Sequence, residues 1–398
     1  MALCLRSLAI RVASHSRPSH SIRSAARHSQ ILNDCSSARL GTQRRGLRSI
    51  ADLEDLTKTK DTQGKPIKTH IEEQDVIMSA PISSAPPAVP DQPDASASSG
   101  ALPAASAPPS IILTLSCPDG QGIVHNVSGW LASRGLNIRD SAQYGDPVTS
   151  TFFMRVHAEA FKGANKGAGL TVDRLKEEFQ RDMASELGMQ FEVREDTYKP
   201  RTLIMVSKIG HCLNDLLFRV SSGTLPIAVP LIISNHNDYA PLAKAHNIPF
   251  YHLPISVKEG KTKEMQEAEI LRLAEEYKID LVVLARYMQI LSPKLCDIMS
   301  GRIINIHHSF LPAFVGAKPY HQAHARGVKL IGATSHVVTR DLDEGPIIEQ
   351  DVERVTHADS PADLVRIGAD IEARVLARAV RWFAEHRVLL NGNKTVVL

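Results

Sequence analysis

Apolar and polar positions between residues 111 and 195 predict a small domain of strands and helices in the order βαββαβ. Apolar residues at helical spacing follow the turn PDGQG and recur from Val172 to Met183. Extended patterns lie on either side of these helices, at 111–117, through Tyr144, at 150–158 and at 189–195. This order within one short segment is that of the split, ferredoxin-like arrangement. We therefore expect a ferredoxin-like domain over 110–197.

Strands and helices alternate in the rest of the chain. The apolar runs TLIMVS (202–207), IDLVVLA (279–285) and RIINI (302–306) are almost continuous, which is typical of strands buried on both faces. Amphipathic helical patterns separate these runs, so the segment 200–398 predicts a Rossmann-like, mostly parallel α/β sheet. Ligands of such sheets bind beyond the carboxyl ends of the strands.

The first 109 residues show no pattern of a packed core. Residues 1–50 contain nine Arg, no Lys and a single acidic residue, with an interrupted apolar stripe. This composition predicts a mitochondrial transit peptide and a location in the mitochondrial matrix; a disordered basic tail is the alternative. Residues 51–109 end in a stretch of Ser, Ala and Pro that cannot offset the entropy cost of ordering, which predicts a disordered linker.

Charge and cysteine usage exclude several functional classes. The net charge is +3, but the first fifty residues contribute +8, so the remainder carries −5 and lacks the basic balance of a nucleic-acid-binding body. No apolar run approaches the ~18 residues needed to span a membrane. The five cysteines are widely separated without a CxxC pair, which predicts reduced thiols in place of disulfides or zinc ligands.

The sequence NIHHSFLP at 305–312 carries the main candidate chemistry. Asn305 and His307 are two residues apart at the end of a predicted strand, so their side chains point the same way. An amide and a protonated imidazole are donors suited to a developing oxyanion. A carboxylate is still needed to manage protons, and the turn LDEGP offers Asp343, with Asp341 and Glu344 as rivals that spacing alone does not separate.

Three other sites can be considered from the same residues. A metal site could draw on several histidines, but there is no HExxH, and the HQAH pair supplies at most two ligands: the set is His307, His308, His321, His324 and His336. Ser309 lacks the GxSxG turn of a nucleophilic serine. GQGIVH resembles the start of a dinucleotide fingerprint, but its third glycine position is His125. We therefore expect an acid/base site without a metal.

These motifs are also where a family resemblance enters. INIHHSFLPAFVGAKPYHQAHARGVKLIGATSHVV followed by LDEGPIIEQDVERV resembles the folate-dependent formyltransferase and formyl-hydrolase superfamily. Within it, HHSFLPAFVGAKPYHQA and LARYMQILSP are similar to the formyltetrahydrofolate deformylases. The resemblance covers about 111–398, and it implies that 110–197 is an ACT regulatory domain and 200–398 a formyltransferase-type catalytic domain.

The resemblance implies hydrolysis of 10-formyltetrahydrofolate to tetrahydrofolate and formate, with no catalytic cofactor and no metal. It assigns Asn305 and His307 to the formyl carbonyl, and it selects Asp343 to hold His307 protonated and to position and deprotonate the attacking water. The folate pocket would use Arg286, Tyr287, Met288, Gln289, Ile290, Leu291 and His336. An amino-acid effector would bind the ACT domain near Asp119, Gly122 and Asn137. The implied partners are the folate, this effector and further copies of the chain in a homo-oligomer, with no nucleic acid and no membrane.

Two alternatives remain from the sequence. Glycinamide ribonucleotide formyltransferases begin the corresponding domain with a Gly-x-Gly-Ser-Asn phosphate loop. Here the segment is SKIGHCLNDLL (207–217), in which only Gly210 remains, so water is the expected acceptor in place of an amine. The second alternative is a protein that binds folate and an amino acid without turnover.

Overall fold

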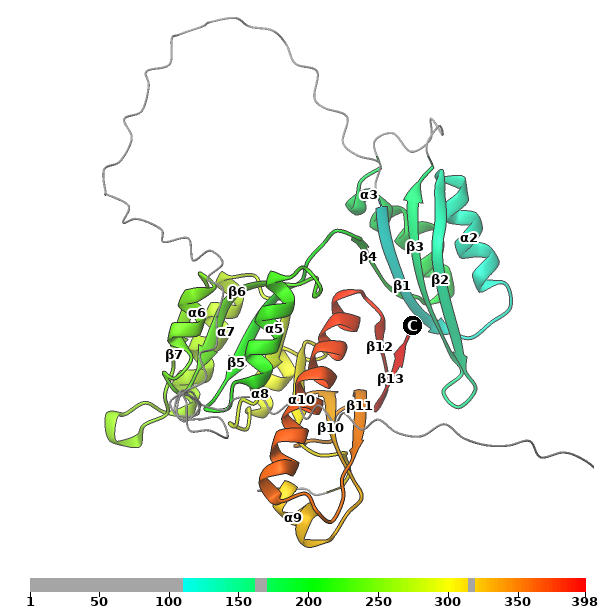
Figure 1. Cartoon of the computed structure of the whole chain (residues 1–398). Coiled ribbons are helices and arrows are strands. Elements are labelled where there is room, and N and C mark those ends of the chain that lie inside the picture. The colour runs from blue at the N-terminus through cyan, green and yellow to red at the C-terminus, as the bar shows by residue number, and fades with distance from the viewer. Residues whose placement is uncertain (1–109, 162–169, 314–318) are drawn as a thin grey trace, which may run out of the picture. The chain divides into compact units, whose positions relative to one another are not determined.

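The computed structural model of the chain describes residues 110–161, 170–313 and 319–398 (Figure 1). The predicted transit peptide (1–50) and linker (51–109) lie outside the described residues. The described residues form two α/β parts, each with its own sheet and core. No helix in them combines the length and the apolar character that crossing a bilayer requires.

The first part is a four-stranded antiparallel sheet with helices on one face. Its strand order is β2-β3-β1-β4, as the ferredoxin-like prediction requires. The elements are β1 (Ser110–Pro118), α2 (Ile123–Ser133), β2 (Leu136–Asp146), β3 (Thr151–Ala160), α3 (Val172–Phe179), η3 (Gln180–Ala184), α4 (Ser185–Leu187) and β4 (Gln190–Glu195). Trp130 of α2 packs edge-on against Phe179 of α3, with ring centroids 5.0 Å apart, and joins the two helices in one core.

The three residues predicted to bind an effector do not converge within one chain. Asp119 and Gly122 follow the end of β1, where Pro118 pairs with Thr151. Asn137 instead pairs with Glu159, at the opposite end of β3. Eight residues of extended strand separate the two ends, which corresponds to roughly 25 Å. Within one chain, these three residues therefore do not form a single site; the reason is the antiparallel return of β2.

The second part is a seven-stranded sheet in the order β11-β10-β9-β8-β5-β6-β7. Strands β9, β8, β5, β6 and β7 run parallel, whereas β10 and β11 are antiparallel to their neighbours, so the mostly parallel prediction is confirmed. The elements are β5 (Arg201–Val206), α5 (His211–Ser221), β6 (Ala228–Ser234), α6 (Ala240–Ala245), β7 (Phe250–His252), η4 (Val257–Glu259), α7 (Lys263–Glu276), β8 (Leu281–Leu284), α8 (Pro293–Ile298), β9 (Ile303–His307), α9 (Pro319–Ala325), β10 (Leu330–Val337), β11 (Ile347–Arg354), α10 (Pro361–Ala384), β12 (Val388–Asn391) and β13 (Lys394–Val397).

Burial on both faces explains the continuous apolar strands. In β5, Ile204 and Val206 belong to the core that includes α5 and α10, while Leu203 and Met205 belong to the core that includes α7 and α8. Successive side chains of a strand point to opposite faces, so every position of a central strand must be apolar.

The strand order places the predicted chemistry at the carboxyl ends of neighbouring strands. Strands β8, β9 and β10 are neighbours. The segment 286–291 follows β8, His307 ends β9, and the turn 338–346 joins β10 to β11. Because β8 and β9 are parallel, their carboxyl ends meet, and the turn returns to the same place. The hairpin β12–β13 was not predicted from the sequence.

Candidate active site

Asn305, His307 and His336 come together through the pairing of β9 with β10. The register sets Asn305 opposite His336, and His307 opposite Thr334. Directly opposed residues of antiparallel strands hold their side chains about 5 Å apart on one face. All three predicted residues line one cavity of about 270 Å³. The i, i+2 argument from the sequence therefore holds for Asn305 and His307.

The structure selects Asp343 among the three candidate acids. Its carboxylate lies 3.2 Å from Nδ1 of His307 and 3.6 Å from Nε2 of His336. Asp341 and Glu344 are exposed, and neither is paired with these imidazoles in the described part of the chain. Hydrogen bonds to His307 and His336 outweigh burial and hold the pKa of Asp343 well below its ordinary value. Asp343 is therefore a carboxylate throughout the physiological pH range.

The backbone of the turn is built for this placement. Asp343 has φ +58°, in the left-handed region that non-glycine residues seldom adopt. Gly345, two residues later, approaches its neighbours so closely that a Cβ atom would lie 1.7 Å from the carbonyl oxygen of Val337. The LDEGP motif therefore needs its glycine for a close approach that brings the acid to the histidines.

The amide of Asn305 has a fixed orientation. Nδ1 of His336 lies 3.0 Å from the carbonyl oxygen of Val337, and Nε2 lies 3.2 Å from Nδ2 of Asn305. Nε2 of His336 therefore faces both Nδ2 of Asn305 and, at 3.6 Å, the carboxylate of Asp343. Nδ2 of Asn305 carries two N–H groups, so at least one of them is left for another acceptor in the cavity.

His307 likewise keeps one nitrogen for a ligand. Its Nδ1 faces Asp343, while Nε2 is buried and makes no hydrogen bond to any described residue. An unpaired buried polar atom costs free energy and is commonly found where a ligand completes the site. Nε2 of His307 and the amide of Asn305 are two donors that a single carbonyl oxygen could receive.

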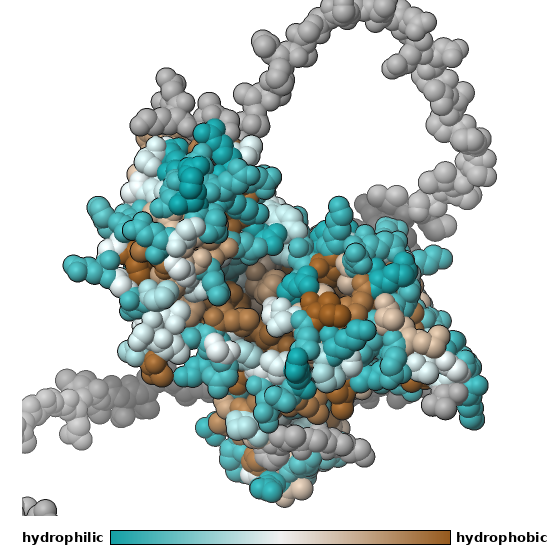
Figure 2. Space-filling model, turned by 180° about the vertical axis from the view of Figure 1, so that it is seen from behind, coloured by the Kyte–Doolittle hydropathy of each residue, from teal (hydrophilic) through white to brown (hydrophobic). Residues whose placement is uncertain are grey.

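The segment after β8 forms a second wall of the cavity. Every residue predicted for folate binding lines it: Arg286, Tyr287, Met288, Gln289, Ile290, Leu291 and His336. The backbone N–H of Met288 donates to Oγ of Ser207, which ties this segment to the end of β5. Met288 and Ile290 are more than half exposed. Figure 2 shows that hydrophobic patches interrupt the mostly hydrophilic face seen in that view. Exposed apolar side chains beside a mostly apolar cavity with a few polar groups suit a ligand with flat rings.

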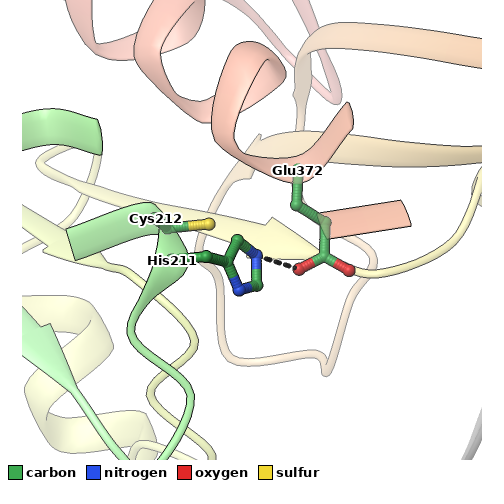
Figure 3. A group of neighbouring side chains, drawn as sticks. All are labelled: His211, Cys212 and Glu372. Carbon is green, nitrogen blue, oxygen red and sulfur yellow. Dashed lines mark hydrogen bonds and ion pairs between the residues drawn. The ribbon is translucent and has the colours of Figure 1, made fainter. Parts of the chain in front are cut away.

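A buried charged cluster lies behind Arg286, and sequence reasoning missed it. Glu372 of α10 accepts hydrogen bonds from the hydroxyl of Tyr320 (2.6 Å) and from Nε2 of His211 (2.8 Å), and it lies 3.4 Å from Nε of Arg286. Figure 3 shows His211 and Glu372 pointing toward each other, with the sulfur of Cys212 beside them. The one signal in the sequence was an acid within the apolar stripe of α10.

His211, Cys212 and Glu372 are close enough to hold a metal ion, but their surroundings disfavour one. The guanidinium of Arg286 already supplies positive charge next to the carboxylate. Burial raises the pKa of the Cys212 thiol well above its ordinary value, so the sulfur stays protonated. His321 and His324 are exposed on α9 and line neither the cavity nor this cluster.

Comparison with known proteins identifies the family of the chain. A family model described as formyl transferase matches residues 200–380. Formyltetrahydrofolate deformylase of Corynebacterium sp. (strain P-1) is 49% identical over 287 residues, which are 72% of this chain and 97% of the relative. The chain belongs to the formyltetrahydrofolate deformylase family.

A more distant relative and a crystal structure indicate the same family. The Escherichia coli (strain K12) formyltetrahydrofolate deformylase is 38% identical over 287 residues, which are 98% of its length. The crystal structure of the Burkholderia mallei formyltetrahydrofolate deformylase matches with a TM-score of 0.68 and 49% identity, covering 73% of this chain and all of that one. The predicted fold class and family are confirmed.

Proposed function

We propose that this protein hydrolyses 10-formyltetrahydrofolate to tetrahydrofolate and formate. The observation that carries the proposal is the contact of Asp343 with His307, beside the amide of Asn305, in a cavity walled by 286–291. Relatives named formyltetrahydrofolate deformylase support this reaction for the chain. The enzyme would be a hydrolase that cleaves the C–N bond of a formamide.

The reaction needs charge stabilisation on one oxygen and a placed water. The formyl oxygen would accept hydrogen bonds from the free N–H of Asn305 and from Nε2 of protonated His307. These donors meet the negative charge that develops when water attacks the formyl carbon. The carboxylate of Asp343 would hold the imidazolium of His307 and orient the water. No step in this scheme requires a metal or a catalytic cofactor.

Transfer to an amine acceptor is the less supported alternative. The start of α5, where a phosphate loop would lie, carries His211 and Cys212, and His211 is bonded to buried Glu372. Relatives that match 72% of this chain are named formyltetrahydrofolate deformylase. We therefore propose water, and not an amine, as the acceptor of the formyl group.

An assay of formate release tests the proposal directly. Purified full-length protein should release formate from 10-formyltetrahydrofolate, with the same rate in the presence of a metal chelator and without any added amine. Release only when glycinamide ribonucleotide is added would support transfer instead. Binding of the folate without any release, under all amino-acid conditions, would support a binding protein and overturn the hydrolase.

Three further features are proposed for the chain. The segment 1–50 would direct import into the mitochondrial matrix and then be removed, which sequencing the amino terminus of the mature protein would test. The ferredoxin-like part would be an ACT domain that binds an amino acid, and calorimetric titration with glycine and methionine would test this. We propose a homo-oligomer, to be measured by light scattering.

A further inference from the structure

The contacts of Asp343 raise the question of where the proton of the attacking water goes. Its Oδ2 lies 3.2 Å from Nδ1 of His307 and its Oδ1 lies 3.6 Å from Nε2 of His336, so both carboxylate oxygens already face an imidazole. The proposed hydrolysis nevertheless requires a proton to leave the water and a proton to reach the departing nitrogen. A further titratable group beside Asn305 and His307 could accept the first proton and donate the second.

We propose that His308 carries this proton, as general base toward water and then as general acid toward the leaving nitrogen of the folate. The proposal rests on the proposed hydrolysis, and it extends the site by one residue. His308 lines the same cavity as Asn305, His307 and Asp343.

The placement of His308 suits a group that contacts the reactants. It directly follows β9, and its ring stacks on that of His307 with centroids 5.1 Å apart and planes 24° apart. The ring centroid of Tyr320 lies 6.4 Å from that of His308. Among the described residues, His308 makes these ring contacts but no hydrogen bond through its imidazole nitrogens. Its proton-accepting nitrogen is therefore available to a water or a substrate atom.

Burial and the nearby charges keep the imidazole of His308 neutral in the free enzyme. Burial, the guanidinium of Arg286 and the imidazole of His307 lower its pKa to about 4, against the weaker opposing influence of Glu372 and Asp343. A neutral imidazole at physiological pH can accept a proton. Once charged, it would lie next to two cations, so it would give the proton up readily to the nitrogen of the tetrahedral intermediate.

The two reaction steps conserve atoms, electrons and charge. Water oxygen bonds to the formyl carbon while one water proton moves to His308 and the carbonyl electrons move to the oxygen held by Asn305 and His307. The oxyanion then re-forms the carbonyl double bond as the C–N bond breaks. The electron pair of the C–N bond stays with nitrogen, which takes the proton from His308. The formic acid formed loses its remaining acidic proton to solvent and leaves as formate. His308 ends neutral and ready for the next turnover.

Replacing His308 by Gln tests the role, with His324→Gln as matched control because His324 is an exposed histidine on α9. We expect kcat to fall about 10²-fold or more with KM changed little, since acid/base groups typically contribute about 10²- to 10⁴-fold. The control should keep wild-type kcat. Tetrahydrofolate binding by each variant shows that the site is folded.

Chemical rescue separates a proton carrier from a structural residue. In His308→Ala, added imidazole should restore formate release in proportion to its concentration, and a series of substituted imidazoles should follow their basicity. A kcat within threefold of wild type in His308→Gln would overturn the role of His308, as would a low kcat without rescue in a variant that still binds tetrahydrofolate. If the wild type itself released no formate, the proposed hydrolysis would fail instead.

Discussion

The buried pair of Glu372 and Arg286 allows a stability prediction to be worked through in detail. The Glu372 side chain is 2% exposed and that of Arg286 is 9% exposed, and they lie 3.4 Å apart. Nε and Nη1 of Arg286 are buried without a hydrogen bond to any described residue, so the charge of Glu372 is the main compensation for this cation. Glu372→Gln removes that charge and keeps the volume of the side chain.

Breaking a buried ion pair from one side costs about 3–5 kcal/mol, because the remaining charge stays buried without a partner. The glutamine leaves no cavity, and its carbonyl oxygen can still accept the hydrogen bond of Tyr320. The loss should therefore lie near the lower limit, and we expect Glu372→Gln to reduce the free energy of unfolding by about 3 kcal/mol. Glu275→Gln, the same change at an exposed position of α7, should alter it by less than ~0.5 kcal/mol.

Urea unfolding followed by tryptophan fluorescence measures the difference. The chain has two tryptophans, and Trp382 lies on the same helix as Glu372. Both variants are best compared in a Trp130→Phe background, in which Trp382 alone reports on the second part of the chain. A loss below about 1 kcal/mol would refute the reasoning. The double variant Glu372→Gln, Arg286→Met should be more stable than Glu372→Gln alone, because it no longer buries an unpaired cation. A lower free energy of unfolding in the double variant would also refute the reasoning.

The same pair predicts a direction of pH dependence. Burial raises the pKa of Glu372, but the hydrogen bond from His211 and the charge of Arg286 outweigh it, so the pKa is lowered from its ordinary 4.5. A carboxyl group with a lowered pKa stabilises the folded state fully above the pKa of the unfolded chain and loses this effect as the pH falls through the folded value. Wild-type protein should therefore lose stability on acidification more steeply than Glu372→Gln.

Further variants address the catalytic turn and its surroundings. Asp343→Asn should lower kcat for formate release about 10²- to 10⁴-fold while tetrahydrofolate still binds, and near-normal turnover would assign the acid elsewhere. Gly345→Ala should lower both turnover and the melting temperature, because the new Cβ would lie 1.7 Å from the carbonyl oxygen of Val337; unchanged values in both assays would contradict this. Arg286→Gln should raise the pKa of His308 from about 4 toward its ordinary 6.5, as measured by nuclear magnetic resonance titration of its imidazole, and an unchanged pKa would count against the charge argument.

Local patterns in the sequence were sufficient for most elements of the fold. Continuous apolar runs gave the central strands. The start of α10 also has a local cause, because Ser360 and Asp363 form a capping box there. The hairpin β12–β13 was missed because its four-residue strands are too short for a period to emerge.

Positions that depend on distant partners were harder to predict. The acidic turn held three candidate acids, and family resemblance, not spacing, selected Asp343 before the structure placed it 3.2 Å from His307. Asp119 and Asn137 were grouped as one effector site, but the antiparallel sheet separates them in the chain.

The sequence by itself determined the class of fold, the family and the strand end that carries Asn305 and His307, because periodicity and short motifs are local properties. Only the tertiary structure decided that Arg286 is balanced by Glu372, 86 positions away, and that His308 stacks on His307 beside these charges. A buried charge must find its partner wherever packing brings one, and residue spacing along the chain does not record which distant side chains share a low-dielectric environment.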